Sequence, residues 1–277
     1  MQRLRRLLRQ RSARRADGVF VAEGVRVLDA AVAANAPIEA VYYGPEALVA
    51  PVAVALLERA RQAGLRVLAL QAGVIERVSG TVTPQPVLGV VGRVDVELER
   101  LLSPDPVRGV PALVVVCVDV RDPGNLGSIL RSADASGAAA VVCCDGSADV
   151  YNPKTVRASA GSVFHVPIVV ERVPAEVLAA FGVAGFERVG TTPRGGTDYA
   201  VAELAGRVAL VLGNEANGLD AEVASHLDTS VSIPMLGRAE SLNVAMAATV
   251  LCFELARRRR ASGGGAAGDP AGGARLR

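Results

Sequence analysis

The sequence predicts a two-domain α/β protein whose second domain is built on a parallel sheet with helices on both faces. Two observations lead to this fold class. Runs of Val, Ile, Leu and Ala alternate with amphipathic helical patterns along most of the chain. In the second half these runs are continuously apolar, which is typical of strands buried on both faces of a parallel sheet. A charged, proline-rich stretch at residues 93–110 is predicted to be the linker between the domains.

Length and composition set the outer limits of the interpretation. A chain of 277 residues, 51% of them hydrophobic, is long enough for two domains that each have a core. No apolar run approaches the roughly 18 residues that span a bilayer, and the arginine-rich start is unlike a signal peptide. We therefore expect a cytoplasmic protein with no membrane partner. Cys117, Cys143, Cys144 and Cys252 lack the spacing of a metal site or disulfide framework, so we expect core residues and no metal.

The first domain, residues 1–92, opens with "MQRLRRLLRQRSARR", which holds seven arginines and no acidic residue. Its leucines mark one side of a predicted short helix and leave the arginines on the other. The domain is basic overall, and phosphate contacts dominate the affinity of proteins for RNA. We expect RNA binding here, the alternative for the terminal helix being a solvated charge run. The candidate RNA contacts are Arg5, Arg9, Arg14, Arg15 and Arg26.

The rest of this domain alternates strands with helices and is predicted to form a small mixed sheet. The predicted strands are 18–22, 38–43, 65–70 and 87–92, and the predicted helices are 23–36, 45–63 and 72–80.

The second domain, residues 111–260, is acidic and repeats the alternation. Its predicted strands are 112–120, 138–144, 166–170, 186–191, 208–212 and 230–234. Its predicted helices are 123–136, 153–160, 174–181, 219–227 and 241–259. The tail, 261–277, has no pattern and is predicted to be disordered.

Three turns follow strands of the predicted parallel sheet, where open α/β sheets bind ligands. In "DVRDPGNLGSILRSA", Asn125, Ser128 and Arg131 are spaced three apart on one helix face, near amides that favour anions. The alternative is that Arg131 only pairs with Asp134 or Asp122.

The other two turns are "LVLGNEANGLD" and "SIPMLGRAESLNVAMA". Gly213 and Gly218 permit a tight turn around Glu215, and the pattern is neither G-x-G-x-x-G nor a P-loop. Ser241 is a candidate N-cap for the last helix, a role worth about 1 kcal/mol. Capping by Ser241 leaves Asn243 in the first turn unexplained.

Together these turns resemble motifs 1, 2 and 3 of the SpoU (TrmH-type) RNA ribose 2′-O-methyltransferases, a branch of the SPOUT class. They occur in the family's order and spacing, "RASAGSVFHVPI" fits between motifs 1 and 2, and the match covers nearly all of residues 111–256. In the first domain, "FVAEGVRVLDAA" and "TVTPQPVLGVV" resemble the small ribosomal-protein-like substrate domain of many rRNA-modifying members. Departures are confined to Ser136 and to Ala216-Asn217.

The resemblance implies a SPOUT catalytic domain with a C-terminal trefoil knot, an arrangement that general folding rules would not suggest. It also implies S-adenosylmethionine as cofactor and a homodimer formed through the catalytic domain and its last helix. Leu242, Ala245, Met246, Thr249 and Cys252 lie at helical spacing on that helix, and the alternative for this stripe is the core of the same chain. By position, the cofactor-binding residues are Thr191, Leu212, Gly213, Asn214, Gly218, Ile233, Met235, Ser241 and Leu242.

The chemistry implied is methyl transfer to a ribose 2′-hydroxyl, which needs alignment of two reactants and removal of a proton. The resemblance assigns the leading role to Arg131, with Asn125, Glu215, Ser241 and Asn243 in support. His165 and His226 are expected to be structural. Because arginine stays protonated, stabilising an oxyanion or clamping a phosphate is the easier role for Arg131.

The predicted substrate is ribosomal RNA, with that of the large subunit as the first candidate. One alternative is a tRNA ribose 2′-O-methyltransferase, which the extra N-terminal domain disfavours. The other is a non-catalytic RNA-binding or ribosome-assembly factor, which the complete motifs disfavour. A base-methylating SPOUT enzyme is disfavoured for the same reason.

Overall fold

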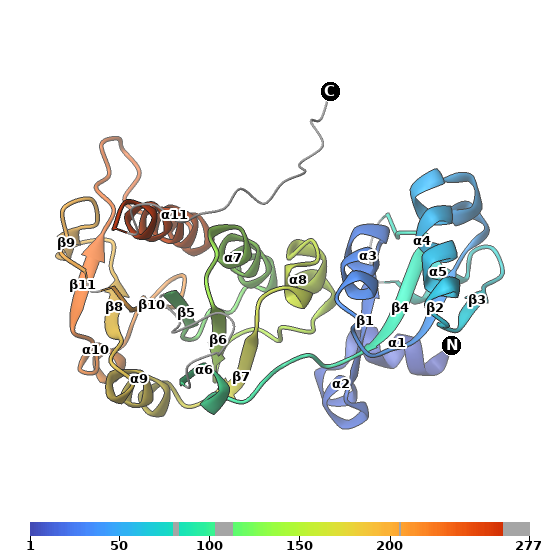
Figure 1. Cartoon of the computed structure of the whole chain (residues 1–277), viewed down its shortest axis with the longest axis horizontal. Coiled ribbons are helices and arrows are strands. Elements are labelled where there is room, and N and C mark those ends of the chain that lie inside the picture. The colour runs from blue at the N-terminus through green and yellow to red at the C-terminus, as the bar shows by residue number, and fades with distance from the viewer. Residues whose placement is uncertain (80–82, 103–112, 205, 263–277) are drawn as a thin grey trace.

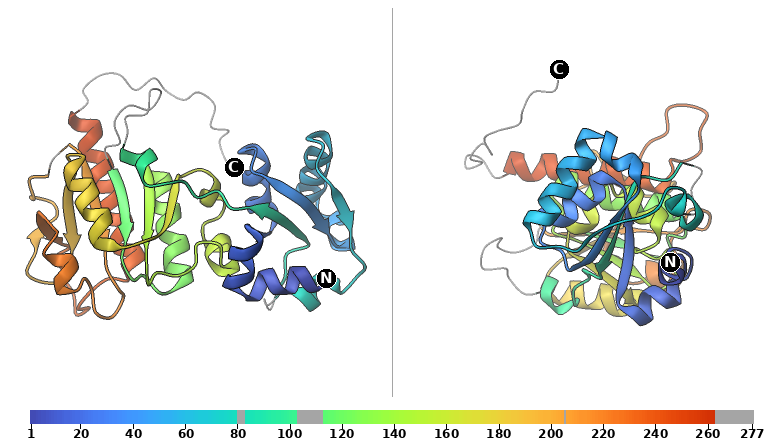
Figure 2. Two further views of the ribbon diagram at one scale, coloured as in Figure 1. Left: turned by 90° about the horizontal axis from the view of Figure 1, so that it is seen from below. Right: turned by 90° about the vertical axis from the view of Figure 1, so that its right-hand side faces the viewer.

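The computed structural model describes residues 1–79, 83–102, 113–204 and 206–262. They form two lobes, each around its own sheet (Figures 1 and 2). The smaller sheet has the order β1-β4-β2-β3. β4 runs antiparallel to β1 and β2, and β2 runs parallel to β3. The strands are β1 (Val19–Glu23), β2 (Ile38–Tyr43), β3 (Val67–Ala69) and β4 (Val87–Gly92).

Helices cover both faces of this sheet, and β1 is therefore buried on both sides. Val19 and Val21 face one group of helices, and Phe20 and Ala22 face the other. The first group is α1 (Gln2–Arg9), α2 (Arg11–Asp17) and α5 (Val74–Val78). The second is α3 (Val25–Ala33), the 3₁₀ turn η1 (Pro45–Val49) and α4 (Pro51–Gln62).

Two helices predicted as single elements are divided in the structure. The N-terminal helix breaks at Gln10, whose backbone is extended (φ −118°, ψ 116°). The helix predicted over 45–63 breaks at Ala50, which is also extended. Pro51 follows it, and a proline disfavours helical conformation in the residue before it.

The larger sheet has seven strands in the order β7-β6-β5-β10-β8-β11-β9, and every neighbouring pair is parallel. This confirms the predicted parallel sheet, with a short edge strand, β9, that the sequence pattern did not indicate. The strands are β5 (Leu113–Cys117), β6 (Ala140–Cys144), β7 (Ile168–Arg172), β8 (Glu187–Thr191), β9 (Thr197–Asp198), β10 (Val208–Leu212) and β11 (Thr229–Ser232).

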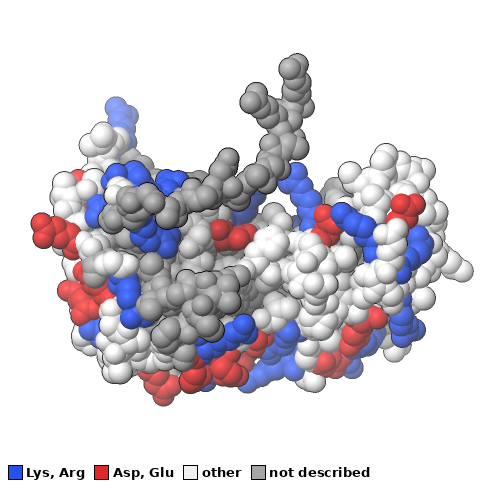
Figure 3. All heavy atoms as spheres, in the orientation of Figure 1, with Lys and Arg blue, Asp and Glu red and all other residues white. Residues whose placement is uncertain are grey.

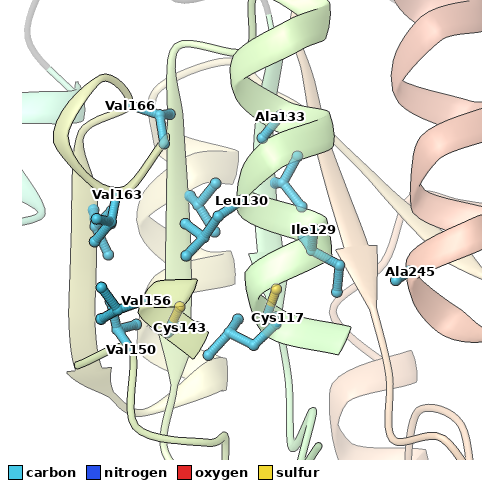
Figure 4. Packing of buried hydrophobic residues seen from close by; sticks show 14 of the residues in the cluster. Cys117, Ile129, Leu130, Ala133, Cys143, Val150, Val156, Val163, Val166 and Ala245 are labelled. Carbon is cyan, nitrogen blue, oxygen red and sulfur yellow. The ribbon is translucent and has the colours of Figure 1, made fainter. Parts of the chain in front are cut away.

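Helices also cover both faces of the larger sheet. One face carries α7 (Pro123–Ser136), α8 (Pro153–Ala158), the 3₁₀ turn η2 (Ser162–Phe164) and α11 (Val244–Ser262). The other carries α6 (Glu99–Leu102), α9 (Pro174–Val183) and α10 (Ala221–Ala224). Figure 4 shows Leu130 of α7 extending toward the strands, whereas Ile129 lies on the side of α7 that faces Ala245 of α11. Burying each such aliphatic side chain contributes about 1.5–3 kcal/mol.

The last helix differs from its predicted range of 241–259. It begins at Val244, and Asn243 caps it: the Asn243 Oδ1 accepts hydrogen bonds from the N–H groups of Ala245 (2.8 Å) and Met246 (3.4 Å). The prediction that Ser241 is the N-cap is therefore wrong. The helix also runs on to Ser262, past the predicted domain boundary at 260, whereas the rest of the predicted tail lies outside the described residues.

The stretch predicted as the linker is partly structured. Its backbone is anchored at Val96, whose N–H donates to the Ile168 carbonyl at 2.8 Å, and it contains α6. Residues 103–110 of the predicted linker lie outside the described ranges. Among the described residues, no helix is both long enough and apolar enough to cross a lipid bilayer.

The two lobes share one continuous hydrophobic core. Phe20 of β1 packs against Tyr151 (ring centroids 4.6 Å apart) and Phe164 (6.0 Å) of the larger lobe. The Tyr151 hydroxyl donates to Asp95 (2.6 Å), and burial followed by this hydrogen bond raises the pKa of Tyr151. Beside these rings, Arg14 forms a buried ion pair with Asp149 at 2.5 Å. The lobes therefore meet in a packed interface that contains apolar, aromatic and ionic contacts.

Candidate functional site

A cavity of about 250 Å³ lies at the carboxyl ends of β8, β10 and β11, with the start of α11 as one wall. This is the edge of a parallel sheet where ligands bind. The lining combines apolar side chains with hydroxyl, amide and backbone groups and one carboxylate, that of Glu215. The described lining residues are Thr191, Thr192, Pro193, Gly213, Asn214, Glu215, Ala216, Asn217, Gly218, Val231, Ile233, Met235, Ser241, Leu242, Val244, Ala247 and Leu251.

The turn after β10 is held by backbone contact and by one asparagine. A Cβ at Gly213 would lie 2.4 Å from the carbonyl carbon of Gly218, and Gly218 itself is left-handed (φ +69°). The Asn214 side chain accepts from the N–H groups of Ala216 (2.9 Å) and Asn217 (3.0 Å) and donates to the Asp119 carbonyl (3.0 Å). The loops after β10 and β5 are thus tied together.

Three polar side chains join the three motif loops into one hydrogen-bonded chain. Glu215 accepts from the backbone N–H groups of Arg121 (3.1 Å) and Asp122 (3.0 Å) and from the Asn125 amide (3.0 Å). The Asn125 Oδ1 in turn accepts from the Asn243 amide at 2.9 Å. Since Asn243 also caps α11, the chain connects the start of α7 to the start of the last helix.

Two carboxylates at the start of α7 are held in the charged form. Desolvation raises the pKa of Glu215, but the hydrogen bonds from Asn125, Asp122 and Arg121 outweigh it and hold this pKa below its usual value. A hydrogen bond from Lys154, followed by the N–H of Asn125, lowers the pKa of Asp122. Asp122 caps α7 by accepting from Gly124 (2.7 Å) and Asn125 (2.9 Å).

Most of the cofactor-binding candidates line this cavity, namely Thr191, Gly213, Asn214, Gly218, Ile233, Met235, Ser241 and Leu242. Leu212 does not, because it is fully buried in the sheet. Sequence reasoning missed Val244, Ala247 and Leu251, which line the cavity from α11. Their spacing of three and four was the available signal. It also missed Asp122, although an aspartate just before a proline at the first helical position is a usual N-cap.

The five catalytic candidates divide into two groups. Asn125, Glu215 and Asn243 are hydrogen-bonded to one another, whereas Arg131 and Ser241 are exposed and outside that chain. The Arg131 side chain makes no hydrogen bond or ion pair with any residue that the structure describes. The acids weighed as its partners are engaged elsewhere: Asp134 pairs with His165 (3.0 Å) and Asp122 with Lys154 (2.8 Å).

The histidines have structural partners. His165 contacts Asp134, and the His226 Nδ1 lies 2.9 Å from the Glu222 carbonyl at the end of α10. Within the described ranges no cluster of three or more His, Cys, Asp or Glu side chains is arranged to hold a metal ion.

The candidate RNA contacts also divide. The prediction is wrong for Arg14, which is 4% exposed and donates to Asp149 and to the Leu7 carbonyl. Arg15 is exposed but pairs with Glu171 at 3.2 Å. The side chains of Arg5, Arg9 and Arg26 are exposed and make no hydrogen bond or ion pair with another described residue.

A parallel sheet whose carboxyl-end loops enclose a cavity beside a fixed polar network defines an α/β enzyme domain that binds a small ligand. Residues 112–253 match the model of the SpoU rRNA methylase family, and residues 2–89 match that of the MRM3-like substrate binding domain. The chain belongs to the SpoU rRNA methylase family.

Relatives match along both domains. The 23S rRNA (guanosine(2553)-2′-O)-methyltransferase RlmP of Bacillus subtilis is 38% identical over 70% of this chain and 74% of its own. The 23S rRNA (uridine(2479)-2′-O)-methyltransferase of Streptomyces viridochromogenes is 35% identical over 93% of this chain and 89% of its own.

The fold is similar to solved structures at full length. The SpoU methyltransferase AviRb from Streptomyces viridochromogenes, in complex with the cofactor AdoMet, superposes with a TM-score of 0.81 and 34% identity, covering 93% of this chain and 97% of that one. An AdoMet-bound rRNA methyltransferase from Sinorhizobium meliloti gives a TM-score of 0.79 and 30% identity, covering 93% and 94%.

Proposed function

We propose that this protein transfers the methyl group of S-adenosylmethionine to a ribose 2′-hydroxyl of large-subunit ribosomal RNA. The observation that carries the proposal is the hydrogen-bonded chain Glu215–Asn125–Asn243, which joins the three motif loops beside the cavity. The names of the two relatives, both 23S rRNA 2′-O-methyltransferases, support this substrate. So does the match of residues 2–89 to a substrate-binding domain.

The chemistry of the cavity suits S-adenosylmethionine. Its lining contains no described Lys or Arg that would repel a sulfonium cation. Backbone groups around Gly213 and Gly218 can approach the ligand closely, because neither residue has a side chain. Bound there, the cofactor supplies an electrophilic methyl group. Thr191, Gly213, Gly218, Ile233, Met235 and Leu242 would hold it.

We assign separate roles to the catalytic candidates. Arg131 has no described partner, so its guanidinium is free to bind an RNA phosphate or stabilise the oxygen that loses its proton. It stays protonated and is a poor general base. Asn125, Glu215 and Asn243 act by fixing the three loops relative to one another. Ser241 lines the cavity and is placed to contact ligand.

A homodimer through the catalytic domain completes the proposal. The predicted contact stripe is mostly internal, because Ala245 and Cys252 are buried and Thr249 bonds to Ser132 at 2.7 Å. Met246 of this stripe is nevertheless exposed (61%), as are Phe253 on α11 (45%) and Leu236 on the preceding loop (99%). Exposed apolar side chains on one helix are candidates for an interface. Replacing Met246 and Phe253 with glutamate is expected to give monomers in sedimentation velocity, and unchanged mass would contradict this dimer.

Two further features belong to the same proposal. We place the protein in the cytoplasm, because the relatives act on 23S rRNA, a cytoplasmic molecule in bacteria. We also propose the trefoil knot, which the match of residues 112–253 to the SpoU rRNA methylase family supports. Stretching single molecules from both ends should then give a contour length shorter than that of an unknotted chain.

The first test is methyl transfer from labelled S-adenosylmethionine to unmodified 23S rRNA or to tRNA. The wild type is expected to label 23S rRNA and leave an alkali-resistant dinucleotide, the sign of a 2′-O-methylated ribose. Arg131→Ala is expected to lower the rate about 100- to 1,000-fold, as loss of an oxyanion-stabilising donor does. Arg100→Ala, on α6 at the opposite face of the sheet, is the matched control.

Labelling of tRNA alone would contradict ribosomal RNA as the substrate but would still support methyl transfer from S-adenosylmethionine to RNA. Absence of both transfer and cofactor binding would overturn the enzyme and favour an assembly factor.

A further inference from the structure

Three helices from the two lobes form one layer beside the candidate site. α8 lies between α7 and α3, and α11 continues the row on the other side of α7 (Figure 1). The contacts are close: a Cβ at Gly127 of α7 would lie 2.5 Å from the Ala158 Cβ of α8. Beyond α8, a Cβ at Gly161 would lie 2.7 Å from the Ala30 Cβ of α3. Side chains on this layer are therefore held at fixed separations across the domain boundary.

Each of the three helices in this layer carries at least one exposed basic side chain. Arg131 is on α7, Lys154 and Arg157 are on α8, and Arg26 is on α3, and all four are exposed. Arg26 and Arg131 have no partner among the described residues. Arg157 lies 3.7 Å from the buried Glu23, which it shares with Ser79 and the Gln85 N–H.

Lys154 is placed at the edge of the hydrogen-bonded chain. Its ammonium donates to the Asp122 Oδ2 at 2.8 Å, while the Oδ1 of the same carboxylate caps α7 next to Asn125. Its Cε lies 3.2 Å from the position of a Cβ on Gly124. An ammonium has three donors, and the side chain is 57% exposed, so donors remain for a ligand.

The opposite face of the small sheet offers much less free charge. Five arginines of α1 and α2 form ion pairs with acidic side chains. Arg3 and Arg6 pair with Asp17, and Arg11 and Arg15 pair with Glu171. Arg14 is buried and pairs with Asp149. Arg5 and Arg9 alone are unpaired among the described arginines of these two helices. Most arginines of the N-terminal basic run are therefore used in ion pairs within the protein. Acidic and basic side chains are interspersed over the visible surface (Figure 3), so unpaired donors matter more than overall charge.

We propose that the RNA strand next to the methylated nucleotide runs over the α7–α8–α3 layer, with its phosphates bound by Lys154, Arg157 and Arg26. This rests on the proposed function and adds the path of the substrate from the catalytic domain onto the first domain. Lys154 and Arg157 bind the phosphates between the reacting ribose and Arg26. The face of the small sheet that α1 and α2 cover, called here the α1 face, is then not the main path of the RNA.

The test compares two double variants for binding to in vitro transcribed 23S rRNA, without cofactor. Lys154→Gln/Arg26→Gln removes two donors from the layer, and Arg5→Gln/Arg9→Gln removes two from the α1 face. The first is expected to weaken binding at least tenfold at 100 mM salt. It should also lower the slope of log affinity against log salt by about 0.7–0.9 for each lost phosphate contact. The second is expected to stay within about twofold of the wild type.

Controls separate this path from the enzymatic proposal. Arg26→Gln alone should raise the KM for RNA and leave the Kd for S-adenosylmethionine unchanged, because Arg26 is not among the residues that line the cavity. A wild-type affinity of the layer variant, or an equal loss in both double variants, overturns the path. If the wild type binds RNA but transfers no methyl group, the proposed function fails instead, whichever variant loses affinity.

Discussion

Asn243 uses both ends of its amide, and this decides how the last helix meets the catalytic loops. Its oxygen caps α11, and its nitrogen donates to Asn125. Aspartate would keep the capping oxygen and lose the donor, and serine would be too short for both roles. One residue thus links the stability of a helix to the geometry of the site.

Asn243→Ala should affect both properties, and Ser241→Ala only the ligand. Loss of the cap is expected to cost about 1 kcal/mol of the free energy of unfolding, and loss of the Asn125 contact should lower the rate of methyl transfer. Ser241→Ala should leave the melting temperature unchanged, because Ser241 does not cap α11. Thermal unfolding of both variants checks this, and equal destabilisation would contradict it.

Glu215 should stabilise the fold in a pH-dependent way. Its pKa is lower in the folded chain than in the unfolded one, so its contribution is present above the usual glutamate pKa of about 4.3 and is lost as pH falls through the folded value. Glu215→Gln is therefore expected to melt below the wild type at pH 7. The gap should begin to shrink as pH falls below the usual glutamate pKa, and it should close only once pH is below the lower, folded pKa, where the wild-type carboxyl is protonated. A gap that stays constant over pH 3–7 would rule out the ionic contribution.

At this scale the sequence predicted residue types better than contacts. Asn125, Glu215 and Asn243 were named from motifs and are hydrogen-bonded to one another. Arg14 was indistinguishable from its neighbours in an arginine run, because its partner Asp149 is distant in the chain. Which charge finds a partner depends on tertiary packing, and no local pattern records it.

At the scale of elements, the turn after β10 depends on the absence of a side chain. Gly213→Ala would put a Cβ 2.4–2.7 Å from backbone atoms of Gly218 and Leu219, which cannot move independently. We expect a loss of about 1–3 kcal/mol in stability and at least a tenfold weaker cofactor affinity. Gly206→Ala, with nothing within 4 Å of the new methyl group, is the matched control. Calorimetric titration of both variants with S-adenosylmethionine measures the difference.

Element types followed from the sequence wherever burial dictated the pattern. β5, β6 and β10 are buried at every position and read as continuous apolar runs. The start of α11 was misplaced because Ser241 and Asn243 are both good caps, and the choice depends on contacts with α7. β9 has two residues, Thr197 and Asp198, and is too short to show any period.

At the scale of the whole molecule, the shared core makes the two lobes one unit. Phe20, Tyr151 and Phe164 are drawn from both lobes, and Arg14 and Asp149 are paired across the same interface. The sequence predicted two domains and a linker. It could not predict how firmly the lobes adhere, because the contacting residues are far apart along the chain.

Arg14→Ala should destabilise the protein far more than Arg15→Ala. Removing Arg14 leaves the largely buried Asp149 unpaired, a change that costs about 3 kcal/mol or more. Arg15 and Glu171 are a more exposed pair, whose loss should cost less than about 1 kcal/mol. Urea unfolding of the full chain compares the two. A similar midpoint for both variants would show that the buried pair does not hold the lobes together.

The strand order β7-β6-β5-β10-β8-β11-β9 has a consequence for biosynthesis. β5 pairs with β10, yet residues 113–117 leave the ribosome long before residues 208–212. At roughly 5–20 residues per second, one edge of β5 waits about 5–20 s for its neighbour. An unpaired apolar edge is a template for wrong pairing during that time. The nascent chain therefore presents an open strand to chaperones until most of the protein has been translated.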